Sequence, residues 1–347
     1  MPIKAAVCEA AQTALVVKDV DGPVSPLAKG SVIVRTAAVA INPFDCAMQA
    51  YGSTFFPFLS FPAVFGEDVA GTIEEVADDV TDFQVGDRVA GLSQRQGFQE
   101  RAVLLAHMAY KVPPSISWAD AATLPMGVVV SIFGLFHKDY LNLRMPSVAP
   151  SVNSPPAGGL RDVVLVWGAS TSVGSQAVQL AAAAGYEVVT TASPKRFDYA
   201  KSIGATHVFD YSSPSVADDI KKATEGRRLV GAFCNGGIVP GSFPGIIRAC
   251  ADVVRGTARP FLALTMVMPA EGVPEGVEGK FIAGVHDDPD FSLKFLGADG
   301  YIPRALAAGT HKIAPEARIA GHGLEAVQGA MDTLKAGVSA TKVVVTL

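Results

Sequence analysis

Short apolar runs and helical segments alternate along the middle of the chain. The run Val163–Val166 is four consecutive apolar residues, which is typical of a strand buried on both faces. Residues 175–184 have a helical composition, and Gly185 is placed to end that helix. Further strands are predicted at 187–191, 207–210, 230–234, 260–266 and 280–285, with helices at 215–224 and 243–254. This alternation predicts a mostly parallel, doubly wound sheet.

The first part of the chain has a different pattern, in which short strands are separated by Gly and Pro. The predicted strands are 3–7, 31–40, 69–76, 88–90 and 101–105. Turn signals such as Asp21-Gly22-Pro23 and Val85-Gly86-Asp87 lie between them. We interpret this region as a barrel-like β domain, after which helical character begins at 119–124 and continues at 128–138.

The last part of the chain is predicted to return to the first domain. It contains a predicted helix at 291–308, a helix at 323–336 and a closing strand at 342–347. The sequence therefore predicts an α/β protein in three stretches. We expect residues 1–125 to form the β-rich domain, 126–290 the doubly wound domain, and 291–347 to complete the first domain.

The turn after the first strand of the doubly wound sheet is a candidate anion site. A strand, a tight turn and a helix direct backbone N–H groups and a helix N-terminus at one place, which suits the pyrophosphate of a dinucleotide. The three glycines of the usual fingerprint fall at Ala169, Thr171 and Gly174, so only the last is kept. The hydroxyls of Ser170, Thr171 and Ser172 can donate to phosphate. The alternative is a strand–helix–strand crossover that binds no ligand.

The end of the next strand favours a phosphorylated cofactor. An NAD-binding unit would place an acid there to hold the ribose 2′-hydroxyl. This chain instead has Ser193, Lys195 and Arg196, whose cations can pair with a 2′-phosphate. The alternative, a solvated helix start, is disfavoured because cations there oppose the helix dipole. We therefore predict NADPH as the cofactor.

Charge and composition exclude several classes of partner. The chain has 347 residues, a net charge of −5 and 18% charged residues, so no basic field would hold nucleic acid or an anionic membrane. No run of 18 apolar residues occurs, and the first residues carry no signal-like stretch, which predicts a cytoplasmic protein. The four cysteines are scattered and predict neither a disulfide framework nor a clustered zinc site.

An ordered set of motifs resembles the medium-chain dehydrogenase/reductase superfamily. The motifs are Ala40–Asp45, Gly66–Gly71, Val85–Val89, Gly168–Gly174 and Lys342–Val345. The resemblance covers nearly the whole chain. It implies a GroES-like β-barrel catalytic domain and a Rossmann nucleotide-binding domain.

Within that superfamily the chain resembles the zinc-free branch. Zinc-dependent members carry a Cys ligand where Asn42 stands, a His where Glu67 stands, and a third ligand near Met126. Their four-cysteine structural zinc lobe is absent from this sequence. A catalytic zinc needs about three ligands from Cys, His or carboxylate groups, so we expect no metal.

The segments 191–199 and 209–211 are similar to those of fungal trans-acting enoyl reductases, with zeta-crystallin-type quinone oxidoreductases next. The resemblance implies that the residues matching Ser193, Lys195 and Tyr211 hold the 2′-phosphate and adenine end. The other residues expected at the cofactor, beside Arg196 and the Ser170–Ser172 hydroxyls, are Phe44, Asp45, Val130, Val173, Leu264, Thr265, Lys342 and Val343.

The predicted reaction is reduction of an activated C=C bond by hydride from NADPH. Tyr51 is the candidate proton donor, and water is the alternative. The expected substrate is a small apolar enone or enoyl thioester, with a polyketide synthase carrier protein as a candidate partner. Two other functions stay open: an NADPH:quinone reductase, and an NADPH-binding accessory protein without turnover. The sequence leaves monomer and homodimer equally open.

Overall fold

The computed structural model describes residues 2–148, 162–236, 245–267 and 272–347. The chain divides into two compact units. Unit 1 is Met1–Met126 with Asp288–Leu347, and unit 2 is Gly127–Asp287. These boundaries lie within three residues of the predicted ones at 125/126 and 290/291. The stretch 142–160 is rich in Pro, Ser, Asn and Gly, which predicts a loop, and it lies partly outside the described residues, from 149 onward.

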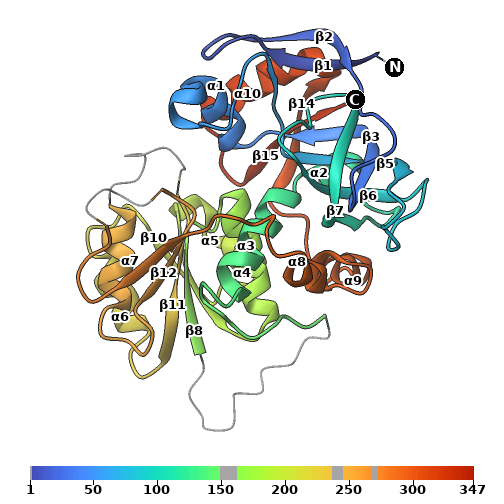
Figure 1. Ribbon diagram of the computed structural model, residues 1–347. Helices are drawn as coiled ribbons and strands as arrows, with labels where there is room; N and C mark the ends of the chain where they lie inside the picture. The colour runs from blue at the N-terminus through green and yellow to red at the C-terminus, as the bar shows by residue number, and fades with distance from the viewer. Residues whose placement is uncertain (1, 149–161, 237–244, 268–271) are drawn as a thin grey trace. The chain divides into compact units, whose positions relative to one another are not determined.

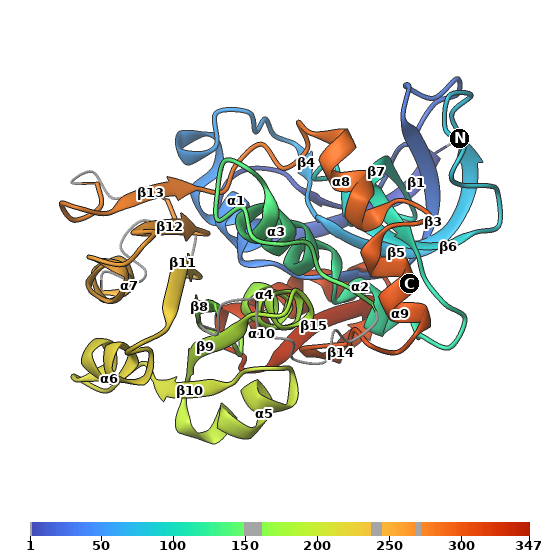
Figure 2. The same cartoon turned by 90° about the horizontal axis from the view of Figure 1, so that it is seen from below.

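Unit 2 is built on a six-stranded sheet in the order β10-β9-β8-β11-β12-β13, which can be followed in Figure 2. Every neighbouring pair in this order is parallel. The strands are β8 (Asp162–Trp167), β9 (Glu187–Ala192), β10 (His207–Asp210), β11 (Arg228–Cys234), β12 (Phe261–Leu264) and β13 (Glu278–Phe281). The chain runs outward from β8 to β10 and then returns to β11. The switch in direction therefore lies between β8 and β11, where ligands of doubly wound sheets bind.

Helices cover both faces of this sheet. The helices of unit 2 are α3 (Pro125–Phe136, which starts at the boundary between the units), α4 (Ser172–Ala183), α5 (Phe197–Ser202), α6 (Val216–Ala223) and α7 (Ile246–Val254). Figures 1 and 2 show α6 and α7 on one side of the sheet and α4 on the other. The doubly wound fold is therefore present as predicted from the alternating pattern.

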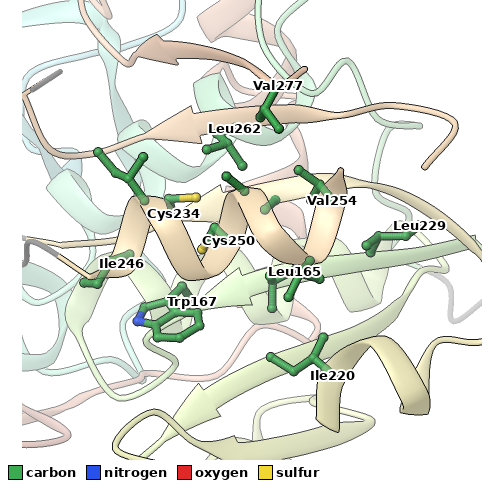
Figure 3. Close-up of a cluster of buried hydrophobic side chains, with 14 of the residues drawn as sticks. Leu165, Trp167, Ile220, Leu229, Cys234, Ile246, Cys250, Val254, Leu262 and Val277 are labelled. Carbon is green, nitrogen blue, oxygen red and sulfur yellow. The ribbon is translucent and has the colours of Figure 1, made fainter. Parts of the chain in front are cut away.

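A buried apolar cluster holds α6 and α7 against the sheet (Figure 3). Leu165 and Trp167 of β8 pack there with Ile220 of α6, and Cys234 of β11 lies beside Cys250 of α7. All four cysteines of the chain are buried free thiols. Here Cys234 and Cys250 are small apolar side chains of the core.

Unit 1 contains a β-barrel that the two ends of the chain build together. Its main sheet has the order β14-β15-β3-β5-β6-β7, and β3 also pairs with β7, which closes the barrel. The strands are β3 (Ser31–Ala40), β5 (Asp68–Val76), β6 (Arg88–Ser93), β7 (Arg101–Lys111), β14 (Glu316–His322) and β15 (Thr341–Thr346). A second sheet contains β1 (Pro2–Cys8), β2 (Leu15–Asp21) and β4 (Ala63–Val64). Strand β15 pairs antiparallel with β3, so the C-terminal segment returns to the first domain.

The helices of unit 1 differ from the predicted ones at residues 43–55, where no helix was predicted, and at 291–308. They are α1 (Pro43–Phe55), α2 (Trp118–Ala122), α8 (Pro289–Leu296), α9 (Tyr301–Ala307) and α10 (Val327–Lys335). The single helix predicted at 291–308 is wrong, because the chain breaks between α8 and α9. At this break Gly300 lies so close to α8 that a Cβ on it would be 2.5 Å from the Phe295 carbonyl oxygen.

One helical stretch among the described residues, Trp118–Phe136, is long and apolar enough to cross a membrane. Of its most apolar window, 83% is buried inside the protein. A core helix of a soluble domain has the same properties, so this stretch does not indicate a membrane span.

Candidate active site

The turn between β8 and α4 is held in place by one hydroxyl. The Thr171 Oγ1 atom caps α4 by accepting a hydrogen bond from the Gly174 N–H at 2.9 Å, and it donates to the Gly168 carbonyl at 3.1 Å. Gly168 has a φ of +86°, which the turn requires and a side chain would resist. The Thr171 hydroxyl, predicted as a phosphate donor, is therefore engaged within the turn itself.

The other predicted residues of the turn lie around the start of α4. Ser170 precedes the cap, while Ser172 and Val173 are the first two residues of the helix, and all three are half-buried. Backbone N–H groups of a first helical turn point along the axis toward an anion. This arrangement suits a pyrophosphate, although Gly174 is the one glycine present at the three fingerprint positions.

Gly174 is required by the close approach of α4 to the turn. A Cβ at this position would overlap the carbonyl oxygen of Gly168. The Gly174→Ala variant should therefore lose about 1–3 kcal/mol of unfolding free energy, because the overlap forces the backbone apart. It should also bind dinucleotide more weakly. Chemical denaturation and a cofactor titration measure the two effects.

Gly329→Ala is the matched control for that substitution. Gly329 lies in α10, and a Cβ there would meet no atom within 4 Å. Since Ala is a better helix former than Gly, this variant should be as stable as the wild type or slightly more so. Equal stability of the Gly174→Ala variant and the wild type would contradict the packing role of Gly174.

A polar network that was not predicted joins the ends of three strands. The amide of Asn235, just after β11, donates to Thr171 Oγ1, and its oxygen accepts from Thr265 Oγ1 at 3.1 Å. Thr265 follows β12, whose last residue Leu264 is fully buried. The network fixes the turn at the switch point of the sheet. A polar residue directly after an apolar strand is the sequence signal that could have pointed to Asn235.

The residues predicted to hold a 2′-phosphate lie at one edge of the same sheet. Ser193 and Lys195 follow β9, and Tyr211 follows β10. Asp210 pairs with Ala192 in the parallel register, so Tyr211 and Ser193 are neighbours at the carboxyl ends of these strands.

The side chains at this edge are accessible. Lys195 is exposed, Arg196 is half-buried and Tyr211 is 51% exposed. Asp210, the last residue of β10, accepts hydrogen bonds from the hydroxyl and backbone of Ser212, which lower the pKa of its carboxyl. The carboxylate is thus bonded within its own loop. The edge presents cations and hydroxyls, which fits a phosphorylated ribose.

Unit 1 holds a buried ion pair where β15, β5 and the start of α1 meet. The Lys342 ammonium lies 2.8 Å from Asp68 Oδ2 and donates to Asn42 Oδ1 at 2.5 Å. The Asn42 amide nitrogen donates to Asp68 Oδ2 at 2.9 Å. We call these three residues the Lys342 network. The other Asp68 oxygen accepts from the Met126 backbone N–H at 2.7 Å, at the start of α3.

This network does not resemble a zinc site. Asn42 is bonded to both charged members of the network, and Glu67 and Met126 add only one carboxylate and a thioether. Among the described residues, no group of three or more His, Cys, Asp and Glu side chains is arranged to hold a metal ion. The donor set therefore does not fit the three-ligand requirement of catalytic zinc. Lys342 was predicted at the cofactor, but its ammonium is bonded inside this network. Val343, also predicted there, is buried.

Two buried acids lie beside the network. Asp45 Oδ2 accepts the Asn42 backbone N–H at 2.7 Å and so caps α1, whereas Oδ1 has no hydrogen-bond partner. Burial, helped by the charge of Asp68, raises the pKa of Asp45 to about 7 against the opposing backbone hydrogen bonds of Asn42 and Gly66 and the Lys342 charge. Asp45 was predicted at the cofactor, but its side chain is fully buried.

Glu67 is the second buried acid. Its side chain is 3% exposed, and its Oε2 atom has no hydrogen-bond partner. Burial raises the pKa of Glu67 well above its ordinary value. The charges of Asp45 and Asp68 raise it further, while Arg95 opposes them. A carboxyl in this setting favours its protonated form. The sequence pointed to Glu67 only as a missing zinc ligand.

Aromatic side chains form a partly exposed patch on α1 and the segment after it. Phe44 packs edge-on against Phe56 with 5.4 Å between ring centroids, and Phe58 is 51% exposed beneath the Arg95 guanidinium. Tyr51 packs against Phe55 at 5.9 Å and is 45% exposed. We call these residues the aromatic patch. The acid role of Tyr51 stays a prediction, as does the cofactor role of half-buried Val130 on α3.

Comparison with known proteins identifies both domains. Residues 28–133 match the family profile of the alcohol dehydrogenase GroES-like domain, and residues 172–242 match that of the zinc-binding dehydrogenases. The predicted pairing of a GroES-like barrel with a Rossmann domain is thereby confirmed.

Full-length relatives occur in fungi. The dehydrogenase azaJ of Aspergillus niger is 42% identical over 99% of this chain and 98% of its own. The trans-enoyl reductase himH of Aspergillus japonicus is 36% identical over 90% of this chain and 89% of its own. Among solved structures, the CurK enoyl reductase superposes with a TM-score of 0.74 at 22% identity, covering 99% of both chains, which shows a shared fold.

Proposed function

Because the chain belongs to the medium-chain dehydrogenase/reductase superfamily, we propose that it is an NADPH-dependent reductase of activated C=C bonds that works without a bound metal. The coarser part of this statement, an oxidoreductase of the enoyl reductase type, follows from full-length fungal relatives such as himH. The preference for NADPH, the C=C substrate and the independence from metal are argued from the site residues of each unit.

The residues that follow β9 and β10 favour NADPH over NADH as the cofactor. Lys195 and Tyr211 follow β9 and β10 at the end of the sheet where dinucleotides bind, and residues 193–196, directly after β9, include no acid to accept a ribose 2′-hydroxyl. A carboxylate there would repel a 2′-phosphate, whereas a lysine can pair with it. This is the observation on which the cofactor assignment rests.

The chain's own residues contribute orientation and electrostatics. NADPH would supply the hydride when bound. The Thr171 cap, Gly174 and the Asn235 network hold the turn that would receive the pyrophosphate. In unit 1, the Lys342 network fixes Asn42 and Asp68 without a metal. Charge on the substrate oxygen must then be stabilised by hydrogen bonds, which a preorganised site supplies effectively.

The aromatic patch favours an apolar substrate. Phe44 and Phe58 provide accessible ring surface around the buried Phe56, and Tyr51 joins these rings through Phe55. Such a surface suits the alkyl part of an enoyl thioester, and the likeness to himH favours a thioester over a quinone. A carrier-bound polyketide chain is the corresponding partner, and the quinone remains the competing substrate.

Replacing Lys195 by Ala should weaken NADPH binding by about 10- to 100-fold, the cost of losing one charge-assisted hydrogen bond of about 1.5–3 kcal/mol. Binding of NADH should stay unchanged, because NADH carries no 2′-phosphate. Titration of each cofactor by its fluorescence gives both constants. Lys201→Ala is the matched control, since Lys201 is an exposed lysine on the adjoining helix α5. Equal losses for NADPH and NADH would refute the 2′-phosphate role of Lys195.

A further inference from the structure

A hydrogen bond in unit 2 joins the helix after the predicted 2′-phosphate residues to the turn that would receive the pyrophosphate. The Tyr199 hydroxyl on α5 lies 2.7 Å from the Ser175 hydroxyl on α4. Ser175 is fully buried, and its Oγ atom also lies 2.7 Å from the Thr171 carbonyl oxygen and 2.9 Å from the Ala169 carbonyl oxygen. A single buried hydroxyl therefore connects α5 to the backbone of the turn.

The direction of this bond follows from the number of available protons. A serine hydroxyl has one proton and two lone pairs, whereas a carbonyl oxygen can only accept. The Ser175 proton is shared by the carbonyls of Thr171 and Ala169, so Tyr199 is the donor to Ser175 Oγ. Removing the tyrosine hydroxyl would break the connection to α5, and it would leave the bonds from Ser175 to the turn in place.

The segment that Tyr199 anchors carries the cations of the 2′-phosphate edge. Residues Pro194–Arg196 form one 3₁₀ turn, in which the Arg196 N–H donates to the Ser193 carbonyl at 2.8 Å. Helix α5 begins at the next residue, so Lys195 lies in the turn that leads directly into the helix bearing Tyr199. A shift of α5 relative to the turn after β8 would therefore move Lys195 as well.

A dinucleotide with a 2′-phosphate has to contact the turn and the edge at the same time. Both phosphate groups belong to one molecule, so the second contact gains most when its partner is already held at the right distance. NADH has no 2′-phosphate and makes only the contact with the turn. We propose that Tyr199 is a positioning residue, which holds Lys195 at the distance from the turn that NADPH requires and so raises the affinity for NADPH over NADH. This inference rests on the proposed preference for NADPH.

The first test compares the two cofactors. Tyr199→Phe should weaken NADPH binding by about 3- to 10-fold, the value of one neutral hydrogen bond, and NADH binding by less than about twofold. The phenylalanine ring keeps the packing of the half-buried tyrosine. Titration calorimetry measures both affinities.

Tyr186→Phe is the matched control for the loss of a hydroxyl. The Tyr186 hydroxyl accepts a hydrogen bond from the Arg144 backbone N–H at 3.0 Å. Tyr186 lies directly before β9, whereas Tyr199 lies beyond the other end of that strand. This control should leave the affinities for NADPH and NADH unchanged.

The second test separates positioning from a general stabilising effect. Without the Lys195 ammonium its placement no longer matters, so the double variant Lys195→Ala/Tyr199→Phe should bind NADPH as tightly as Lys195→Ala alone. A purely structural hydrogen bond would instead multiply the two losses. Adenosine 2′-monophosphate is a further probe, because it contacts the edge without bridging to the turn. Tyr199→Phe should leave the affinity for this probe unchanged.

Four results would overturn the positioning role of Tyr199 while NADPH remains the preferred cofactor. They are unchanged NADPH binding by Tyr199→Phe, equal losses for NADPH and NADH, multiplied losses in the double variant, and a loss for adenosine 2′-monophosphate as large as that for NADPH. If the wild type binds NADPH no more tightly than NADH, the proposed cofactor preference itself fails, and the role of Tyr199 with it.

Discussion

Replacing Lys342 by Met is expected to lower the free energy of unfolding by about 3–5 kcal/mol, because a buried ion pair loses one partner. Lys342 is 4% exposed and Asp68 is fully buried, so the Asp68 carboxylate would be left without its cation. Met keeps the apolar stem of the lysine, which separates the loss of charge from the loss of packing. Urea denaturation measures the change.

Two further variants test the origin of this loss. Lys280→Met removes an exposed lysine that pairs with Asp139 at 3.3 Å, and it should cost less than about 1 kcal/mol. Adding Asp68→Asn to the Lys342→Met variant removes the unpaired Asp68 carboxylate and should recover part of the lost unfolding free energy. Equal effects of Lys342→Met and Lys280→Met would contradict the structural role of the Lys342 network.

Asp45→Asn should change how stability depends on pH. The folded-state pKa of Asp45 is raised to about 7 from its ordinary value of 3.8, so the folded protein holds a proton that the unfolded chain releases. The stabilisation from this proton is complete below about pH 4 and is lost as pH rises through about 7. Asn mimics the neutral acid. Relative to the wild type, the variant should therefore gain up to about 4 kcal/mol between these limits.

The contribution of Asp162 to the unfolding free energy is expected to change with pH in the opposite direction to that of Asp45. Hydrogen bonds from Arg228 lower the pKa of the Asp162 carboxyl, so its contribution is present above the ordinary pKa and lost as pH falls through the lowered one. Unfolding curves measured from acid to mildly alkaline pH compare Asp45→Asn and Asp162→Asn with the wild type. A difference between wild type and Asp45→Asn that does not change with pH would contradict the raised pKa, because it would mean that Asp45 binds its proton equally well in the folded and unfolded chain.

The parallel sheet of unit 2 was predictable because its central strands are buried on both faces. Val163–Val166 is a continuous apolar run, and β8 is buried along its whole length. Strand β14 was not predicted, since most of its residues are exposed and give no apolar signal. Strand β2 and helix α1 were also missed. Helix α1 contains Gly52 with a φ of +51°, which interrupts the helical pattern.

The site was predictable where it depends on neighbours in sequence. Ser193, Lys195 and Tyr211 follow two adjacent strands, so strand order alone brings them to one edge. The Lys342 network joins residues 300 and 26 positions apart, and only the folded barrel shows that Lys342 bonds to Asn42 and Asp68. The sequence shows Asn42 and Asp68 as polar residues among apolar ones, but it does not predict that they bond to Lys342.

The most direct measurement is oxidation of NADPH and of NADH by protein treated with a chelator, against a panel of enones, enoyl thioesters and quinones. We predict turnover with NADPH and an enone or enoyl thioester, much weaker turnover with NADH, and no loss of rate after the metal is removed. Turnover with quinones alone, a preference for NADH, or activity that returns only when zinc is added would contradict a metal-free NADPH-dependent alkene reductase.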